Sequence, residues 1–352
     1  MSQRENVNPR REQDHRKNSR RYQKRAAARR RRNTIFIMEI VLLLILAVVL
    51  FFVSKLSKIE KTKLDMDKIE VNEDISQESR KIMKGYQTIA MFGLDNRSNG
   101  NLSQGRSDVI MLANINNDTK EVKLVSVYRD TYLDTGDGIF QKCNAAYAKG
   151  GPEQAISMLN VNLDLNITDY VTVDFNSIIE CVDLLGGVDM EITDDEASLM
   201  TGYIRELNEL TGNKAENLTQ GGTYTLNGVQ ACAYARIRYG GGDDYRRTER
   251  QRTVLTAMVK KAQQSDLTTV NKLINEVCGD IQTSFSNAEL LALASQVFQY
   301  SIGDTTGFPF TKTTKVLSKK TGDVVIPCDL SDNVKELHIF LYEDSAYNAS
   351  DT

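Results

Sequence analysis

The feature that most constrains this chain is an apolar run at residues 34–53, TIFIMEIVLLLILAVVLFFV, whose single charge is Glu39. A helix rises about 1.5 Å per residue, so a run of this length matches the roughly 30 Å hydrocarbon core of a bilayer. A buried core helix is the alternative, but the run has no polar face. A cleaved signal peptide would have a shorter apolar region and a small-residue cleavage site. The sequence therefore predicts a transmembrane signal anchor.

The charges on the two sides of this run are unequal. Residues 1–33 hold 13 Lys and Arg against three acids, a net of +10, while the 352-residue chain as a whole has a net charge of −3. Residues 34–352 therefore carry a net charge of −13. The positive-inside rule places the basic tail in the cytoplasm and the residues from about 54 onward outside the cell.

The basic tail at residues 1–33 has two interpretations. Its run Arg29–Arg32 is of a kind found in nucleic-acid-binding segments. Its composition is also that of a disordered topology signal that touches anionic lipid. We favour the second interpretation and expect no nucleic-acid partner, a single-pass membrane location and a cytoplasmic N-terminus.

Composition excludes several kinds of chemistry. The two histidines, His15 and His338, are far apart in the sequence, and neither has a Cys or His at ligand spacing. A Ser-His-Asp triad or a zinc site built on histidine is therefore not expected. The five cysteines form no CxxC motif, and an exported chain can oxidise them. We expect one disulfide, Cys278–Cys328, or else five cysteines that act as small apolar fillers.

From residue 85 onward the sequence alternates strand and helix patterns. This alternation predicts an α/β fold, layered α/β/α, at 85–265, behind an extracellular linker or stalk at 54–84. Residues 266–352 are either a continuation of that domain or a small subdomain. The expected strands are 88–94, 109–114, 122–128 and 168–175, with a further strand-like VVIP near the C-terminus. The expected helices are 152–161, 176–184, 194–210, 227–235, 246–264, 267–277 and 287–299.

Charged residues collect where the expected strands end or begin. Asp95 follows the first strand, Arg106 and Asp108 open the second, and Arg129-Asp130 closes the third. Two aspartates at adjacent strand ends can converge on one Mg²⁺, which needs few carboxylates and takes water and phosphate oxygens as its other ligands. Strand-to-loop junctions of this kind are where functional residues of layered sheets collect.

A second cluster of arginines lies at residues 236–252, where six occur in 17 residues of a domain that is otherwise acidic. Arg236 and Arg238 share one side of an extended segment, and Arg247 and Gln251 share one face of a helix. Guanidinium groups match phosphate oxygens bidentately, so a diphosphate is the natural ligand. The alternative is a solvated face on which Asp243, Asp244 and Glu249 pair with neighbouring arginines.

These stretches resemble, in order, the LytR-CpsA-Psr (LCP) family of Gram-positive cell envelopes. The matching blocks are FGLDNR (92–97), GRSDVIML (105–112), SVYRDTY (126–132), KCNAAYAKGGP (142–152), ITDYVTVDF (167–175), VDLLGGVDMEI (182–192), LNGVQACAYARIR (226–238) and DYRRTERQR (244–252). Eight ordered blocks are more specific than any one motif.

The resemblance implies an α/β/α domain that holds a polyprenyl diphosphate in an apolar groove and transfers its glycopolymer to peptidoglycan. The implied cofactor is Mg²⁺, with Mn²⁺ as an alternative, held by Asp95 and Asp108. Arg106 is implied as the residue most important for catalysis, beside Asp95 and Asp108. The positions implied to line the diphosphate are Arg129, Lys142, Arg236, Arg238, Arg247 and Gln251, with Asp244 orienting the arginines.

The sequence departs from the family pattern at two positions near the implied site. Tyr128 stands where the family usually has proline, and Ala145 stands where histidine is common. The short spacer at 240–242 leaves Asp243 as an alternative to Asp244, although the three-residue step to Arg247 favours Asp244.

Groove residues cannot be traced from the sequence. The helices at 152–161 and 176–184 supply suitable side chains, although ordinary core packing also explains them. Two other functions remain open, a pyrophosphatase that uses water as acceptor and a non-catalytic regulator or binding module of the cell envelope.

Overall fold

The structure, a computed structural model, describes residues 60–61, 64–94, 102, 105–136, 138–238, 243–266, 268–269, 272–273 and 281–350. Contacts divide the chain into residues 1–55 and 56–352, and the described residues belong to the second unit. The expected basic tail and anchor lie outside the described residues. Within the described ranges, no helix is both long and apolar enough to cross a membrane.

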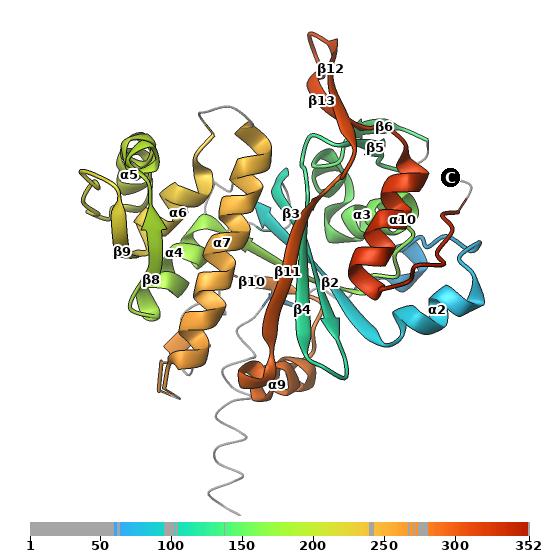
Figure 1. The fold of residues 1–352 in the computed structure, drawn as a ribbon, viewed down its shortest axis with the longest axis horizontal. Coiled ribbons are helices and arrows are strands. Elements are labelled where there is room, and N and C mark those ends of the chain that lie inside the picture. The colour runs from blue at the N-terminus through green and yellow to red at the C-terminus, as the bar shows by residue number, and fades with distance from the viewer. Residues whose placement is uncertain are drawn as a thin grey trace, which may run out of the picture. The chain divides into compact units, whose positions relative to one another are not determined.

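A mixed sheet of seven strands forms the centre of the described part of the chain, in the order β1-β10-β7-β2-β3-β4-β11 (Figure 1). Strands β2, β3 and β4 are antiparallel neighbours, whereas β7 runs parallel to β2 and β11 runs parallel to β4. The bounds are β1 Glu60–Lys61, β2 Tyr86–Leu94, β3 Ser107–Asn116, β4 Glu121–Val127, β7 Asp169–Asp174, β10 Ile281–Thr283 and β11 Ser301–Phe308.

Helices cover both faces of this sheet, so the α/β/α layering expected from the sequence is confirmed (Figure 1). The α-helices are α2 Gln77–Met83, α3 Ala145–Leu163, α4 Phe175–Leu184, α5 Asp194–Thr211, α6 Gly228–Arg236, α7 Asp243–Gln264, α9 Asn287–Ser295 and α10 Leu330–Tyr342. Single 3-10 turns are Met66–Lys68 and Val297–Gln299.

Strand alternation divides the core between the two faces. On β2, Phe92 and Leu94 pack in one cluster with side chains of α3 and α10. Ile89 belongs to a second cluster with Phe285 and the partly buried Leu255 of α7. A third cluster joins α4, α5, α6 and α7 to the hairpin of β8 (Val188–Ile192) and β9 (Gly222–Leu226). Helix α7 thus packs against both the sheet and this side layer.

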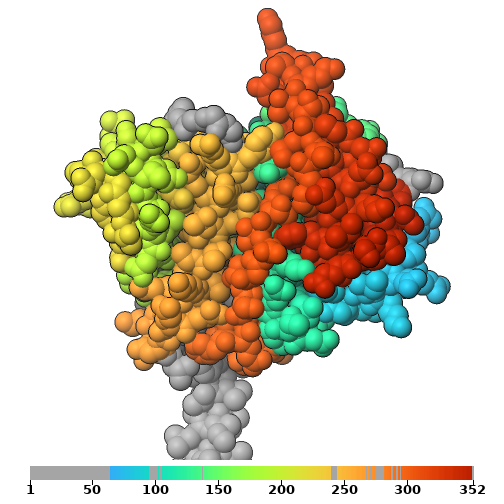
Figure 2. Space-filling view, in the orientation of Figure 1, coloured from blue at the N-terminus to red at the C-terminus, as the bar shows by residue number. Residues whose placement is uncertain are grey.

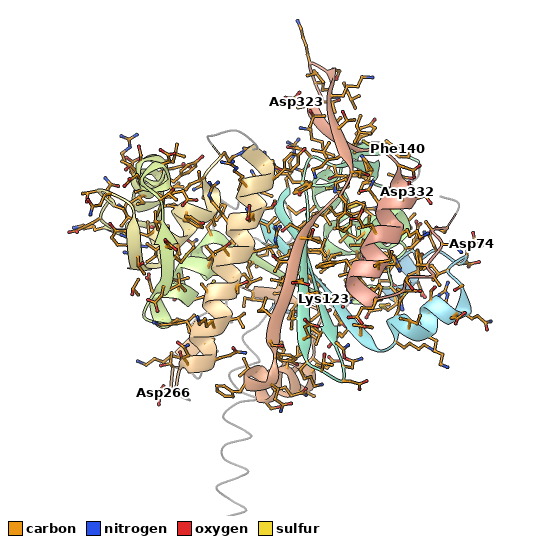
Figure 3. All side chains as sticks on the ribbon, viewed as in Figure 1. Asp74, Lys123, Phe140, Asp266, Asp323 and Asp332 are labelled. Carbon is orange, nitrogen blue, oxygen red and sulfur yellow. The ribbon has the colours of Figure 1, made fainter. Side chains whose placement is uncertain are left out.

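Two further hairpins lie near the end of the sheet at which β4 finishes. They are β5 (Tyr132–Asp134) with β6 (Phe140–Lys142), and β12 (Lys312–Ser318) with β13 (Gly322–Pro327). The β12–β13 hairpin projects beyond the rest of the surface (Figure 2). Figure 3 labels Asp323 on it and Phe140 on β6. Val325 N donates to Asp130 O at 2.9 Å, which joins β13 to the segment that follows β4.

Helix α10 and the residues that follow it pack on one face of the domain around His338. Its ring stacks on Tyr347 with centroids 3.6 Å apart, and its Nε2 lies 3.1 Å from Leu163 O. Burial lowers the pKa of His338 to about 4. The side chain of Asp164 accepts hydrogen bonds from Tyr347 Oη and from Ser350 N, at 2.7 and 2.8 Å, which fixes the tail.

The first three strands expected from the sequence are confirmed, whereas the expected disulfide is not. The strands expected at 88–94, 109–114 and 122–128 are confirmed as β2, β3 and β4. The expected disulfide Cys278–Cys328 is contradicted, because Cys328 is an exposed free thiol, while Cys278 lies outside the described residues. Cys143 and Cys232 are buried in the core, as expected of apolar fillers.

Candidate active site

The structure brings the strand-end charges and the arginines of α7 into one cluster. Arg129 Nη1 lies 2.8 Å from Asp108 Oδ1, which joins the end of β4 to the start of β3. Asp244 Oδ1, in the first turn of α7, lies 4.0 Å from both Arg129 Nε and Arg238 Nη2, and 2.6 Å from Arg247 Nη2. One carboxylate therefore lies among three guanidinium groups. We call these five residues the head-group cluster.

The charges at the centre of this cluster are incompletely compensated. The Arg247 side chain is 6% exposed, and its Nε has no hydrogen-bond partner within the described part of the chain. Burial lowers the pKa of Arg247, an effect that Asp244 opposes. Burial also raises the pKa of Asp244, against the influence of Arg247 and Arg129. The shift of the Arg247 pKa disfavours its charged form, so an anion that supplies oxygens to this guanidinium would stabilise it.

The pKa of Arg129 shifts in the opposite direction from that of Arg247. Burial alone would lower the pKa of Arg129, but Asp108, Asp130 and Asp244 together raise it. This guanidinium is therefore firmly cationic, and it is held by carboxylates on two sides. It can donate a hydrogen bond from one of its N–H groups to a phosphate while the carboxylates hold it in position.

Arg236 and Gln251 lie between the head-group cluster and an apolar pocket. Arg236 Nη2 lies 3.2 Å from Glu206 Oε1, and its guanidinium lies over the ring of Phe175, 4.8 Å from the centroid. Arg236 Nη1 and Gln251 Oε1 are buried and have no hydrogen-bond partner among the described residues. Both side chains line the pocket, where they supply its polar end.

The apolar pocket has a volume of about 140 Å³ and lies between the sheet and helices α4, α6 and α7. Val109 and Met111 of β3 line it from one face of that strand, β2 lines it over residues 91–94, and α7 presents residues at helical spacing. A Cβ atom added at Gly93 would lie 2.8 Å from Val109 Cβ, so only glycine fits against β3 here. Its apolar lining comprises Met91, Phe92, Leu94, Val109, Met111, Val173, Phe175, Ile178, Cys232, Ala235, Val254, Leu255 and Met258.

The groove residues are only partly those that the sequence suggested. Ile178 of α4 lines the pocket, as the segment 176–184 allowed. The suggestion for 152–161 is wrong, because this part of α3 packs in the core on the opposite face of the sheet. Helical spacing could have identified the pocket residues of α7. Positions i, i+3, i+4 and i+7 share one helix face, and they are occupied here by Gln251, Val254, Leu255 and Met258.

The remaining predicted site residues lie around the head-group cluster. Arg106 is exposed at the start of β3, where it can reach a ligand. Lys142 Nζ lies 2.9 Å from Asp130 Oδ1, and Asp130 Oδ2 lies 3.7 Å from Arg129 Nε. Lys142 therefore joins the same network through Asp130.

The predicted metal pair is only half within the described residues, because Asp95 lies outside them. Asp108 is 29% exposed, and Arg129 contacts its Oδ1. No group of three or more possible metal ligands occurs in the described part of the chain. One partly exposed carboxylate still suits Mg²⁺, which takes one or two carboxylates and completes its shell with water and phosphate.

Two other arginines of α7 make structural contacts, although with other partners than the acids of the alternative interpretation, and Arg246 is exposed. Arg250 Nε lies 3.0 Å from Glu196 Oε1, which joins α7 to the N-terminus of α5. Arg252 Nη1 donates to Ser126 Oγ at 2.8 Å. The cluster of six thus divides between ligand-facing and structural roles, a division that the sequence alone did not make.

A family model described as the LytR_cpsA_psr family matches residues 46–315. The chain belongs to this family. Similar LCP relatives include the polyisoprenyl-teichoic acid–peptidoglycan teichoic acid transferase TagU of Enterococcus faecalis, 30% identical over 59% of this chain and 64% of the relative. Biofilm regulatory protein A of Streptococcus mutans is 31% identical over 56% of this chain and 49% of the relative. The match spans less than two thirds of each of these relatives.

Solved structures of LCP proteins share the fold of this chain. TagT bound to LI-WTA superposes with a TM-score of 0.60 at 22% identity, over 80% of this chain and 99% of that one. TagT with bound octaprenyl pyrophosphate lipid superposes with a TM-score of 0.57 at 21% identity, over the same shares of 80% and 99%. The mixed α/β architecture is therefore that of the LCP family.

Proposed function

We propose that this chain is a membrane-anchored phosphotransferase that moves a glycopolymer from a polyprenyl diphosphate carrier to peptidoglycan. The observation that carries the proposal is that two buried guanidinium nitrogens, Arg236 Nη1 and Arg247 Nε, have no hydrogen-bond partner in the described part of the chain and lie toward one end of an apolar pocket. Arg236 lines that pocket, and Arg247 lies one turn of α7 before the pocket residue Gln251. A lipid diphosphate has this same order of apolar tail and oxygen-rich head.

The relatives support the same class of substrate. The TagU and TagV relatives are named as transferases of polyisoprenyl-linked teichoic acid to peptidoglycan, and one LCP structure holds octaprenyl pyrophosphate. The polymer carried by this chain's substrate is a teichoic acid, a capsular polysaccharide or another secondary wall glycan.

In the proposed reaction, a sugar hydroxyl of peptidoglycan attacks the phosphorus next to the glycan. A new phosphorus–oxygen bond forms to that hydroxyl oxygen, and the bond to the polyprenyl phosphate breaks. Polyprenyl phosphate leaves, and the hydroxyl proton passes to a carboxylate, with Asp108 and Asp130 as the described candidates. Catalysis then depends on position and electrostatics more than on covalent participation of the protein.

The arginines would supply most of the electrostatic stabilisation of the phosphate oxygens. Arg129, Arg238 and Arg247 would hold the diphosphate oxygens, with Asp244 fixing their directions. Arg106, being exposed, would reach the oxygen on which charge develops. Asp108, together with Asp95, would hold Mg²⁺, with Mn²⁺ as a substitute. When bound, the ion supplies positive charge that neutralises the phosphate oxygens.

The proposal includes the membrane location. Residues 34–53 would anchor the chain, with residues 1–33 in the cytoplasm and the LCP domain outside. A reporter enzyme fused after Thr352 tests this orientation: activity outside the cell is expected, and activity in the cytoplasm would contradict it.

Turnover by the full-length protein tests the reaction. The protein is reconstituted with Mg²⁺, a polyprenyl-diphosphate glycan and peptidoglycan oligomers, and the products are separated by mass. We expect glycan on the acceptor together with free polyprenyl phosphate, and loss of both on chelation of the metal. Free glycan phosphate in place of the conjugate would identify a pyrophosphatase. Binding without turnover would identify a non-catalytic module.

A further inference from the structure

An aromatic and lysine cluster lies beside the head-group cluster and has no part in the function proposed above. The rings of Tyr128 and Tyr245 meet edge to face, with centroids 4.6 Å apart. Lys312 Nζ lies over both rings, 5.0 Å from the Tyr128 centroid and 4.7 Å from that of Tyr245. Tyr128 directly precedes Arg129, and Tyr245 directly follows Asp244. This cluster and the head-group cluster therefore adjoin along two elements.

Lys312 is fixed in place by backbone carbonyl groups. Its ammonium donates to the carbonyl oxygens of Pro309 and Phe310, at 3.0 and 3.3 Å. It forms no ion pair with a carboxylate in the described ranges. Burial lowers the pKa of Lys312, as expected for a cation that lacks a countercharge. An anion bound here would supply that charge.

The two tyrosines differ in exposure. Tyr128 is 7% exposed and is held against Gly307, where any added Cβ would overlap its hydroxyl. Tyr245 is partly exposed. Tyr128 therefore supports the cluster from behind, while Tyr245 and Lys312 can reach a ligand.

Positions along α7 show which part of a substrate would meet this cluster. Val254 and Met258 line the apolar pocket, Arg247 belongs to the head-group cluster, and Tyr245 lies nearer the N-terminus of the helix. At about 1.5 Å per residue, Tyr245 and Met258 are roughly 20 Å apart along the axis. With a lipid tail in the pocket and a diphosphate at the head-group cluster, the attached sugar lies toward the N-terminal end of α7, where Tyr245 adjoins Asp244 of that cluster.

The hairpin that Lys312 begins is positively charged. It carries Lys312, Lys315, Lys319 and Lys320 against one acid, Asp323, within a region whose net charge is negative. It projects from the end of the sheet at which β4 finishes (Figure 1), and Arg129 of the head-group cluster follows β4 closely. The family match ends at residue 315, so most of the hairpin lies beyond it.

We propose that Tyr245 and Lys312, supported by Tyr128, form a subsite for an anionic sugar attached to the diphosphate. The proposal rests on the proposed function, whose substrate class it makes more specific. The edge and face of Tyr245 would pack on the apolar side of the pyranose ring, and Lys312 would bind its carboxylate or phosphate.

Binding of three ligands by the full-length protein tests the subsite. The ligands are geranylgeranyl diphosphate and the same lipid diphosphate bearing either glucuronate or glucose. Lys312→Gln should weaken glucuronate-lipid binding about tenfold or more, because a charge-assisted contact is lost. Binding of the glucose lipid and of the sugar-free lipid should change less than about twofold. Lys312→Arg should restore most of the glucuronate preference.

Lys319→Gln, at the exposed end of the same hairpin, is the matched control and should leave all three affinities unchanged. Melting temperatures of each variant exclude unfolding as a cause. An equal loss for all three ligands in Lys312→Gln would mean that Lys312 only supports the head-group cluster, and would overturn the subsite. Absence of binding of any lipid diphosphate by the wild type would instead overturn the proposed function.

A second variant keeps the test independent of the charge. Tyr245→Leu should weaken both sugar-bearing ligands relative to geranylgeranyl diphosphate, because the ring that packs on the pyranose is lost. Unchanged ratios between the three affinities in this variant would contradict a sugar contact at Tyr245.

Discussion

Asp244 Oδ1 lies 2.6 Å from Arg247 Nη2 in the first turn of α7, and both side chains are largely shielded from solvent. The same carboxylate faces Arg129 and Arg238 at 4.0 Å, and Arg129 has further partners in Asp108 and Asp130. Burying the Arg247 guanidinium, whose Nε has no hydrogen-bond partner in the described part of the chain, costs stability unless a ligand supplies one. The surroundings of Arg247 therefore suit an anion.

We expect inorganic diphosphate to stabilise the protein through Arg247. At about 100 times its Kd, a ligand of the native state adds about 2.7 kcal/mol of stability. Arg247→Gln should lower the affinity about tenfold or more and so reduce the rise in melting temperature at the same concentration. Arg250→Gln, which loses the pair with Glu196 outside the site, should retain the wild-type rise. Equal rises in both variants would contradict the assignment of Arg247.

Arg106→Ala should abolish transfer without destabilising the fold. Arg106 is exposed, and surface substitutions of this kind change stability by about 0.5 kcal/mol or less. Removal of a group that stabilises developing charge typically costs about 10²–10³ in rate. Arg205→Ala, an exposed arginine on α5, is the control and should keep full activity. Wild-type turnover by Arg106→Ala would show that the catalytic assignment is wrong.

Ala235→Phe should separate the pocket from the head-group cluster. Ala235 lines the apolar pocket, and a phenyl ring there would occupy space that the lipid chain needs. Burial of each CH₂ contributes about 0.8 kcal/mol, so exclusion of one isoprene unit should weaken geranylgeranyl diphosphate binding more than tenfold. Calorimetry should show unchanged affinity for inorganic diphosphate. A parallel loss of both affinities would mean that the variant disturbs the arginines.

His338 should make stability fall in mild acid. Its pKa is lowered to about 4 by burial, whereas an unfolded histidine titrates near 6.5. Between these values the unfolded chain binds the proton and the native state does not, so stability decreases as pH falls from about 6.5 toward about 4. The full effect is on the order of 3 kcal/mol.

Urea titrations across this pH range test the role of His338. His338→Phe keeps an aromatic ring beside Tyr347 but cannot titrate, so its stability should depend less on pH than that of the wild type. Because carboxylates titrate in the same range, the difference between the two proteins is the quantity to compare. Identical pH profiles would contradict a buried neutral His338.

The strands that position the site were predictable because each is a short run of alternating or continuous apolar residues. Strand β11 was not predicted, because its sequence SIGDTTGF lacks alternation and its first six residues are exposed or half-buried. It joins the sheet through parallel pairing with β4, a partner far away in the sequence. Helix α10 was also missed, although Asp329 caps it and Leu337 and Leu341 pack in the core.

The site residues show the same division. Spacing alone placed Arg247 and Gln251 on one helix face, and both lie toward the ligand region. Residue spacing could not separate Arg247 from Arg250, because the two arginines carry the same charge and differ only in the direction in which their side chains leave α7. Lys312 was not found from the sequence, since it comes from a hairpin far along the chain from Tyr128 and Tyr245.

The sequence by itself determined the charge division around residues 34–53, the family and the residue types available for chemistry. These properties can be determined from local sequence because hydrophobicity, charge and the order of motifs do not depend on contacts with other segments. Only the tertiary structure decided which face of the sheet holds the pocket and which arginines have buried nitrogens without a hydrogen-bond partner among the described residues. Those properties depend on packing between distant segments: α7 covers one face of the sheet and α3 the other, and burial sets the cost of each charge.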